Sequence, residues 1–235
     1  DIPWLFDNKQ QVYEVLDGPL GDRLAEGLEE SGFKLLQWQE NSFRTLSTNK
    51  PINDMSDLKG VKIRIMENEL QLQQWKNYGA NPTPMAFTEL FTALQQKTVD
   101  AQDNGAELTW QTKFYEVQSH YTYTKHIYSP YLILMSKDKF DGLTPEQQEI
   151  VLKVSDEAVA YERQRCDEYE QVALENIKNC GTMQYSDLAP EVKAEMVKAC
   201  EGLKDMAYTK VTNPDVVDLL YDEVAKAKEK FPEEG

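Results

Sequence analysis

Alternation of apolar and polar residues marks the start of the most informative stretch of the chain, residues 60–105. Within residues 61–65 the apolar side chains share one face, and Arg64 lies on the other, which predicts a strand. The next pattern predicts a helix over residues 69–78 that ends at Gly79, a residue type that commonly follows a helix in the left-handed conformation. After it the sequence predicts an extended passage at Asn-Pro-Thr-Pro, a helix over residues 88–97 and a buried strand over residues 99–102. Strands that alternate with helices in this way indicate an α/β sheet.

Two polar residues fall at the carboxyl ends of these predicted strands. Arg64 lies near the end of the first strand, and Asn104 follows the second. Because ligands of open α/β sheets tend to bind at this edge, Arg64 and Asn104 are candidates for a ligand site.

The rest of the chain carries further periodic segments. Residues 33–38 predict a strand, residues 107–117 a helix, and the apolar run from Tyr131 to Met135 a strand at the centre of a sheet. A capping box at Thr144 opens a predicted helix of more than thirty residues that ends near Asn179. Its apolar positions are Ile150, Val154, Ala158, Tyr161, Val172 and Ile177. Two amphipathic helices are predicted after it, over residues 190–210 and 214–228.

The order of four motifs resembles the solute-binding proteins of TRAP transporters, of the dicarboxylate-binding (DctP) type. The motifs are LKGVKIRI, GANPTPMAFTELFTALQ, VDAQDN and KFYEVQ. The resemblance implies a two-lobed α/β periplasmic binding protein (type II-like), in which a long helix spans both lobes. Its role would be to capture an organic acid, a monocarboxylate or a dicarboxylate, and to deliver it to the membrane permease subunits.

The resemblance also implies a division into lobes. The family has several strands and helices before the segment that matches Pro3-Trp4-Leu5-Phe6. We therefore expect an incomplete first lobe and interpret the chain as a fragment rather than as a protein with an abbreviated lobe. The expected lobe I comprises residues 1–40 and 130–165, the expected lobe II comprises residues 41–129 and 166–230, and the helix over about residues 144–179 bridges both.

The family's ligand contacts can be carried over position by position. Arg64 would clamp the ligand carboxylate, because a guanidinium offers a planar fork of donors. The resemblance gives supporting roles to Arg44 and Asn104, and it places Phe87 against the body of the ligand. Glu67 and Tyr131 are further candidates that would line the cleft. The motif that ends at Asn104 departs from the common pattern at Ala101, Asp103 and Gly105, which puts the shape of that loop in question.

Each of these residues also has a structural interpretation. Arg64 could be a solvated arginine at a strand end, and Asn104 a turn residue before glycine. Phe87 and Tyr131 could both be ordinary core residues, since each lies in an apolar context. The spacing of Trp110 with Phe114 favours helix packing over a pocket lining.

Composition narrows the range of partners. The net charge of −16 argues against nucleic acid and against anionic membrane surfaces, although a few arginines can still focus an anion in a pocket. No run reaches the ~20 apolar residues that a membrane span requires, and Asp1 starts no signal peptide, so the resemblance implies a periplasmic protein whose export signal has been removed. Of the three cysteines, Cys180 and Cys200 could form a disulfide or remain thiols.

Enzymatic signatures are missing from the sequence. His120 and His126 have no zinc-ligand spacing, and the chain contains no GxSxG, P-loop or GxGxxG motif. We therefore expect no catalytic residue, no metal and no cofactor. The alternative to solute capture is a truncated, self-associating fragment or interaction module that binds no ligand and forms a homodimer through the incomplete lobe. A hydrolase with paired carboxylates has no support in the sequence.

Overall fold

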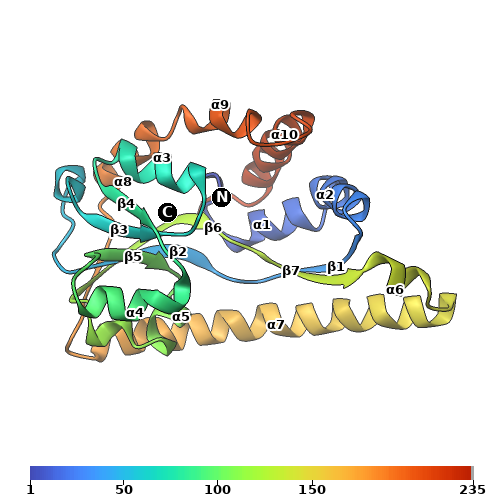
Figure 1. Cartoon of the computed structure of the whole chain (residues 1–235), viewed down its shortest axis with the longest axis horizontal. Coiled ribbons are helices and arrows are strands. Elements are labelled where there is room, and N and C mark those ends of the chain that lie inside the picture. Colours follow the sequence, from blue (N-terminus) through green and yellow to red (C-terminus); the bar gives the residue numbers. More distant parts are fainter. Residues whose placement is uncertain (234–235) are drawn as a thin grey trace. The chain divides into compact units, whose positions relative to one another are not determined.

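A computed structural model describes residues 1–233, and the chain forms two compact units in it (Figure 1). Unit 1 contains the motifs of residues 60–105. It comprises residues 1–4, 42–128 and 169–210, and the described part of unit 2 comprises residues 5–41, 129–168 and 211–233. The helix α7 (Pro145–Asn179) contributes to both units.

Unit 1 is built on a six-stranded mixed sheet with the order β4-β3-β5-β2-β6-β8. The parallel pairs are β3 with β4, β3 with β5 and β6 with β8, whereas β2 is antiparallel to both β5 and β6. The mixed α/β architecture predicted from the sequence is confirmed. The strands are β2 (Phe43–Thr48), β3 (Lys62–Ile65), β4 (Asn81–Pro84), β5 (Ala101–Asn104), β6 (His120–Tyr128) and β8 (Gln184–Asp187).

The Asn-Pro-Thr-Pro passage forms the edge strand β4 next to β3. Prolines lack the N–H that a central strand must donate on both sides, so an edge position suits Pro82 and Pro84. The edge therefore follows directly from the sequence of this strand.

Helices cover both faces of this sheet. On one face Ile63 and Leu46 pack against Trp75 of α3, Met196 of α8 and Leu203 of α9. The opposite face is covered by two further apolar clusters, from α4 with the Phe114 turn and from α5 with the end of α7. The helical segments of unit 1 are η1 (Met55–Leu58), α3 (Glu69–Asn77), α4 (Phe87–Gln95), α5 (Ala106–Gln111), η2 (Phe114–Glu116), α8 (Pro190–Ala199) and α9 (Leu203–Tyr208).

Two of the predicted helices are interrupted. The single helix predicted over residues 107–117 is wrong, because Lys113 adopts a left-handed conformation with φ 58° between α5 and η2. This break sends Trp110 and Phe114 into different apolar clusters instead of onto one side of a helix. The helix predicted over residues 190–210 is likewise divided into α8 and α9.

Gly79 ends α3 in the left-handed conformation that the sequence predicts, with φ +80°. The amide of Gly79 donates to the Lys76 carbonyl at 2.9 Å, and the amide of Ala80 donates to the Trp75 carbonyl at 3.0 Å. These bonds satisfy carbonyl groups that the helix end would otherwise leave unpaired.

We expect Gly79→Ala to lower the free energy of unfolding by about 1 kcal/mol, because an L side chain disfavours this φ. Gly27→Ala, inside α2 (Pro19–Glu30), is the matched control. A Cβ atom at Gly27 would meet no neighbouring group within 4 Å, so alanine there should stabilise by up to about 1 kcal/mol. Urea unfolding of both variants measures these opposite changes in the free energy of unfolding. Equal changes in the two variants would contradict the requirement for glycine at position 79.

Unit 2 packs three helices around an apolar cluster. Val15 of α1, Leu20 of α2, and Val224 and Ala227 of α10 form its buried part. A two-stranded antiparallel sheet of β1 and β7 completes the unit, with a bulge between Leu35 and Gln37. The elements are α1 (Lys9–Leu16), α2 (Pro19–Glu30), β1 (Phe33–Gln39), β7 (Tyr131–Ser136), α6 (Lys137–Asp141), residues 145–168 of α7, and α10 (Asp215–Lys230).

The strand β7 exists as predicted, but it is not at the centre of a sheet. Among the described residues it pairs with β1 alone, and Tyr131 is 53% exposed. The helix α10 also differs from the expected division into lobes, because it packs on α1 and α2 in unit 2, whereas residues up to 230 were expected in lobe II.

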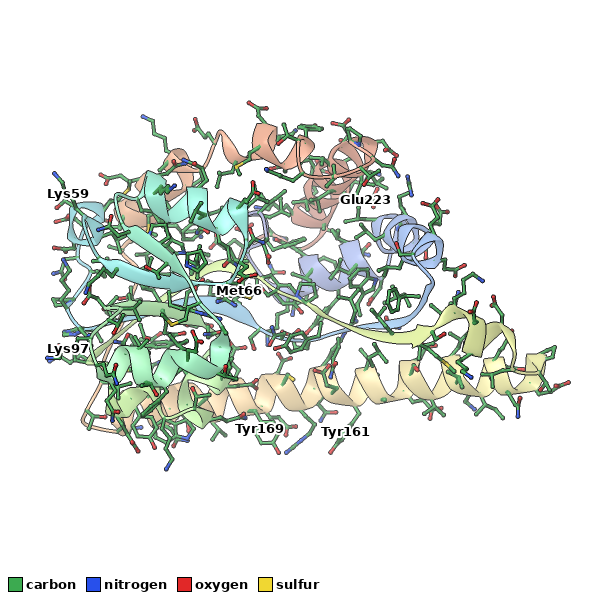
Figure 2. The ribbon with its side chains drawn as sticks, in the orientation of Figure 1. Lys59, Met66, Lys97, Tyr161, Tyr169 and Glu223 are labelled. Carbon is green, nitrogen blue, oxygen red and sulfur yellow. The ribbon has the colours of Figure 1, made fainter. Side chains whose placement is uncertain are left out.

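The long helix begins and ends as predicted, but the predicted apolar stripe is mostly exposed. Ile150, Val154, Tyr161 and Val172 are each more than half exposed, and Figure 2 shows Tyr161 and Tyr169 projecting away from α7. The buried positions lie on the largely opposite face of the helix, at Ser155, Val159, Glu170, Ala173, Leu174 and Ile177. The predicted position Ile177 thus belongs to the buried face. The helix carries apolar residues on both faces, so its own periodicity does not decide which face is covered.

Cys180 and Cys200 are both thiols in unit 1. The Cys180 thiol donates to the Ile177 carbonyl at 3.2 Å, and the Cys200 sulfur lies 2.9 Å from the Tyr78 hydroxyl. Each sulfur therefore has its own polar contact.

Candidate functional site

The polar residues of unit 1 gather at one edge of its sheet. Arg64 and Asn104 lie at the carboxyl ends of the parallel strands β3 and β5, and Arg44 lies at the beginning of the antiparallel strand β2. Because β2 runs in the opposite direction, its first residues share an edge with the last residues of β3 and β5. Figure 2 labels Met66, which directly follows β3 at this edge.

The guanidinium of Arg64 is hydrogen-bonded through Nε, whereas its two terminal amino groups have no partner among the described residues. Its Nε donates to the Met85 carbonyl at 2.9 Å, and its guanidinium lies 5.8 Å from the centre of the Phe87 ring. Within residues 1–233, neither of its two terminal amino groups has a hydrogen-bond or ion-pair partner, although the residue is only 4% exposed. Burial, and next the nearby charge of Arg44, lower the pKa of Arg64, and Asp103 partly offsets this. The guanidinium nevertheless stays charged, because arginine does not lose its proton in proteins.

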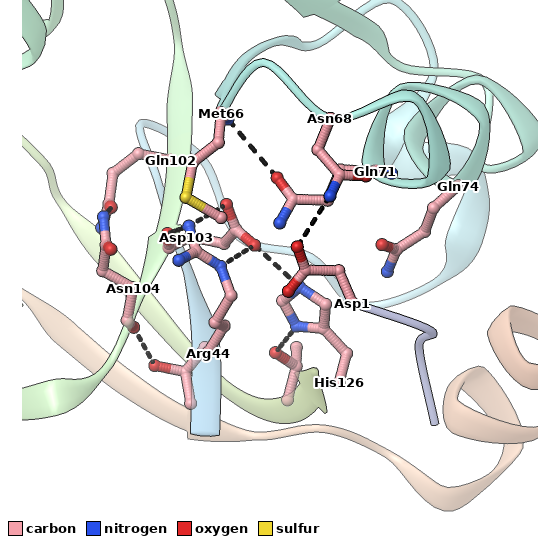
Figure 3. A network of polar contacts seen from close by, with 12 residues as sticks. Asp1, Arg44, Met66, Asn68, Gln71, Gln74, Gln102, Asp103, Asn104 and His126 are labelled. Carbon is pink, nitrogen blue, oxygen red and sulfur yellow. Dashed lines mark hydrogen bonds and ion pairs between the residues drawn. The ribbon is translucent and has the colours of Figure 1, made fainter. Parts of the chain in front are cut away.

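Arg44 is already engaged by Asp103. Its Nε donates to Asp103 Oδ2 at 2.9 Å and its Nη2 to Oδ1 at 3.0 Å, and Nη2 also donates to the Asp103 carbonyl (Figure 3). Two parallel charge-assisted bonds of this kind fix a guanidinium in orientation as well as in charge. Of the donors of Arg44, the Nη1 group is the one left without a partner among the described residues.

His126 extends the ion pair on the other side of Asp103. Its Nε2 lies 3.0 Å from Asp103 Oδ2, and its Nδ1 lies 2.7 Å from the Thr124 hydroxyl. Burial by itself would raise the pKa of Asp103, but Arg44 and His126 outweigh it, so the pKa lies well below the usual range. Asp103 is therefore ionised and neutralises the charge of Arg44.

Asn104 is oriented by its neighbour on the same strand. Its Nδ2 donates to Gln102 Oε1 at 2.5 Å, and Gln102 in turn donates to the Ser47 hydroxyl at 2.8 Å. Residues two apart on a strand face the same side, so Asn104 and Gln102 share a face of the sheet. Arg64 is opposite Gln102 in the register of β3 and β5, which places Arg64 on this face as well.

Three other predicted site residues occupy different environments. Phe87 begins α4, is 40% exposed and makes an edge contact with Phe114 at 6.3 Å between ring centres, so its exposed part is free to contact a ligand. Glu67 is exposed in the bend after β3, three residues from Arg64 in the chain. Tyr131 belongs to unit 2 and is exposed there. The structure thus brings Arg64, Phe87, Asn104 and Arg44 to one edge of the unit 1 sheet.

The sequence patterns did not identify the residues that orient these side chains. In the sequence, Asp103 was noted only because it departs from the family motif, and His126 only because its spacing from His120 does not fit a zinc site. Gln102 and Ser47 were not noted. The sequence does contain a pattern that could have identified these residues. Polar residues alternate with apolar or charged ones along both β2 and β5, and both strands are buried throughout. The polar positions are Thr45, Ser47, Gln102 and Asn104. Polar residues at the positions of a buried sheet face indicate a hydrogen-bonded network.

Neither a metal centre nor a membrane span accompanies this site in the described chain. Residues 1–233 contain no group of three or more His, Cys, Asp or Glu side chains that could hold a metal ion. No helix in this part of the chain is long and apolar enough to cross a membrane.

Comparison with known proteins identifies relatives over most of the chain. The family model of bacterial extracellular solute-binding proteins, family 7 (DctP), matches residues 1–210. The 2,3-diketo-L-gulonate-binding periplasmic protein YiaO of Escherichia coli is 38% identical over 221 residues, which cover 94% of this chain and 66% of that protein. The chain spans about half to two thirds of the length of the curated relatives that it matches.

Solved structures resemble the fold closely. The sugar acid binding protein DctPAm of Advenella mimigardefordensis, in complex with galactonate, has a TM-score of 0.90 at 32% identity, covering 96% of this chain and 73% of that one. A TRAP periplasmic solute-binding protein of Shewanella oneidensis with bound succinate has a TM-score of 0.87 at 26% identity, covering 95% of this chain and 73% of that one.

Proposed function

We propose that this chain, which belongs to the DctP family of bacterial extracellular solute-binding proteins, captures an organic acid and delivers it to the membrane permease of a TRAP transporter. Members of the family are transport binding proteins, and two of the relatives named above, YiaO and the protein of Shewanella oneidensis, are periplasmic. A periplasmic location of this protein, and a role without a chemical step on the ligand, are part of the proposal.

One observation carries the proposal: the unpaired fork of Arg64. A buried guanidinium with two free amino groups is costly unless an anion completes it. A carboxylate matches the spacing of the two groups and accepts both hydrogen bonds in parallel. The hydrogen bond from Nε to the Met85 carbonyl fixes the orientation of the Arg64 guanidinium. Ligand binding therefore costs less side-chain entropy.

The other site residues have supporting roles in this proposal. Arg44 offers a single donor group, Nη1, because Asp103 occupies its other groups. Asn104 contributes an amide beside the carboxylate, and Phe87 covers the carbon skeleton. Glu67 and Tyr131 are further candidates for ligand contact in this proposal.

The energetics are adequate for such a site. A micromolar affinity corresponds to roughly 8 kcal/mol. Charge-assisted hydrogen bonds contribute a net ~1.5–3 kcal/mol each, so two bonds to Arg64 supply about 3–6 kcal/mol. Burial of the carbon skeleton against Phe87 adds to this amount.

Native mass spectrometry of the purified protein tests the proposal. We expect a bound or added organic acid to appear as a mass increase, with a matching rise in melting temperature when the acid is in excess. A monomer that stays empty and shows no thermal shift with sugar acids or dicarboxylates would contradict solute capture. An empty, concentration-dependent dimer would instead favour the interaction module that is the alternative interpretation of the sequence.

A further inference from the structure

The edge of the unit 1 sheet opposite the candidate functional site holds a cavity of about 230 Å³. It lies where β2 ends and where β3 and β5 begin. The polar and charged side chains that argue for a ligand there are Asn49, Lys50, Lys59 and Asp100. Figure 2 shows Lys59 at this edge and Met66, which follows β3, at the other. The cavity therefore shares no lining residue with the proposed site of acid capture.

The lysine side chains at this edge have no acidic partner in the described chain. Lys50 and Lys59 are exposed, and within residues 1–233 neither ammonium group forms a hydrogen bond or an ion pair. Lys62 Nζ donates to the Lys97 carbonyl at 3.2 Å, so two further lysines lie side by side near the same strand ends. These four cations gather at one edge of a chain whose net charge is −16, and they favour an anion there.

Asn49 adds a hydrogen-bond donor to the cavity. Gln118 Nε2 lies 3.2 Å from the Asp100 carbonyl and 2.9 Å from Asn49 Oδ1. Because a backbone carbonyl only accepts hydrogen bonds, this orientation of the Gln118 amide is fixed, and Asn49 must turn its oxygen toward Gln118. Gln118 does not line the cavity, whereas Asn49 does. The Nδ2 group of Asn49, which has no acceptor within residues 1–233, is therefore the group available to a ligand.

The lining also contains a carboxylate, that of Asp100. Its Oδ2 accepts from the Lys62 amide at 3.1 Å, and it forms no ion pair with Lys50 or Lys59. The two ammonium groups of the lining thus exceed its negative charge by one. Because the attraction of an anion to this excess grows with the charge of the anion, a dianion is held more strongly than a monoanion.

We infer that this cavity binds a phosphate-type dianion, a free phosphate or a small phosphomonoester, through Nζ of Lys50, Nζ of Lys59 and Nδ2 of Asn49. The three donors belong to different side chains, so each can reach a different oxygen of a tetrahedral group. Lysine binds phosphate as a point charge, whereas a planar carboxylate is matched better by the paired donors of a guanidinium. A lipid phosphodiester carries one charge, and the net charge of the protein opposes its approach to an anionic membrane. The inference does not depend on acid capture at Arg64.

Isothermal titration calorimetry with inorganic phosphate tests the inference, at about pH 8 so that phosphate is mainly dianionic. We expect saturable one-to-one binding that persists in Arg64→Ala, because the two sites lie at opposite edges of the sheet. Sodium chloride at matched ionic strength should show no such binding, which separates a specific site from screening. Absence of phosphate binding, or its loss in Arg64→Ala, would overturn the inference.

Lys50→Ala and Lys59→Ala each remove one charge-assisted hydrogen bond to the phosphate. We expect each variant to weaken phosphate binding by about 10-fold or more. Lys76→Ala is the matched control, because Lys76 is an exposed lysine of α3 in the same unit but outside the cavity, and it should bind phosphate as the wild type does. Equal affinities of the wild type and both cavity variants would overturn the inference.

Two nearly isosteric variants are expected to act in opposite directions. Asn49→Asp keeps an acceptor for Gln118 but replaces the donor by a negative charge, so phosphate binding should be lost. Asp100→Asn removes the opposing charge and keeps an acceptor for the Lys62 amide, so phosphate should bind about 3-fold more tightly or better. A gain of affinity cannot come from damage to the fold. Unchanged binding in both variants would overturn the placement of the anion in this cavity.

Vesicle flotation distinguishes a free phosphate from a lipid headgroup. We expect no more protein to float with vesicles of phosphatidylglycerol than with vesicles of phosphatidylcholine. Binding to the phosphatidylglycerol vesicles without binding of inorganic phosphate would overturn the inference.

Discussion

Arg64→Ala is expected to weaken binding of the organic acid by about 100- to 10,000-fold. Two charge-assisted hydrogen bonds, at a net ~1.5–3 kcal/mol each, are lost together, and each 1.4 kcal/mol corresponds to about a factor of ten. The variant should still fold, because the Arg64 side chain makes a single hydrogen bond within the described protein, to the Met85 carbonyl. Calorimetric titration measures the loss, and circular dichroism checks the fold.

Arg64→Lys distinguishes the contribution of the two parallel hydrogen-bond donors of the guanidinium from the contribution of its positive charge. Lysine keeps the positive charge but offers one ammonium group in place of two parallel donors, so this variant should also lose most of the affinity. Lys62→Ala is the matched control, since Lys62 is an exposed cation two residues earlier on the same strand. If Arg64→Lys binds like the wild type, charge alone carries recognition. If Arg64→Ala does so, Arg64 is not the anchor.

Asp103→Asn is expected to lower the free energy of unfolding by about 3–5 kcal/mol, the usual cost of leaving a buried charge without its partner. Asp103 is fully buried, and the substitution leaves the Arg44 guanidinium in the same place without a counter-charge. Urea unfolding measures the change. The double variant Arg44→Met with Asp103→Leu is the control: it removes both charges, so it should recover most of the lost stability. A single variant as stable as the wild type would show that the pair is not coupled.

The same carboxylate predicts an acid dependence. The pKa of Asp103 in the folded protein lies below its value in the unfolded chain, which is about 3.9. The ionised pair therefore contributes its full stability above that unfolded value, and the contribution is lost as the pH falls through the lower folded pKa. Stability measured from pH 6 downward should fall less steeply for the double variant than for the wild type.

The local patterns of residues 60–105 were sufficient to predict β3, the extended passage that forms β4, β5 to within two residues, and the edge at which Arg64 and Asn104 lie. The alternation around Arg64, the prolines of β4 and the glycine after α3 each act on their own neighbours in the chain, and the structure has all three where they were predicted. The break at Lys113 could not be predicted in this way, because a left-handed lysine has no signature in the pattern of apolar residues.

The exposed stripe of α7 shows a second kind of limit. A helix with apolar residues on two faces does not specify which face is buried, since that depends on what packs against it. Val159 and Ile177 share a buried face and Val154 and Tyr161 share an exposed face, and each pair by itself fits a helical period.

The sequence by itself determined the α/β order, the family and the arginine that faces the edge of the sheet. These features depend on residues that lie close together in the chain. Their effects can be read directly from hydrophobic periodicity and from the residues that form turns. Only the tertiary structure decided which polar groups already have partners: Nε and Nη2 of Arg44 pair with Asp103, 59 residues away, and Nδ2 of Asn104 donates to Gln102, which donates to Ser47. Such pairs depend on the register between strands, and register sets which distant side chains meet within hydrogen-bond distance.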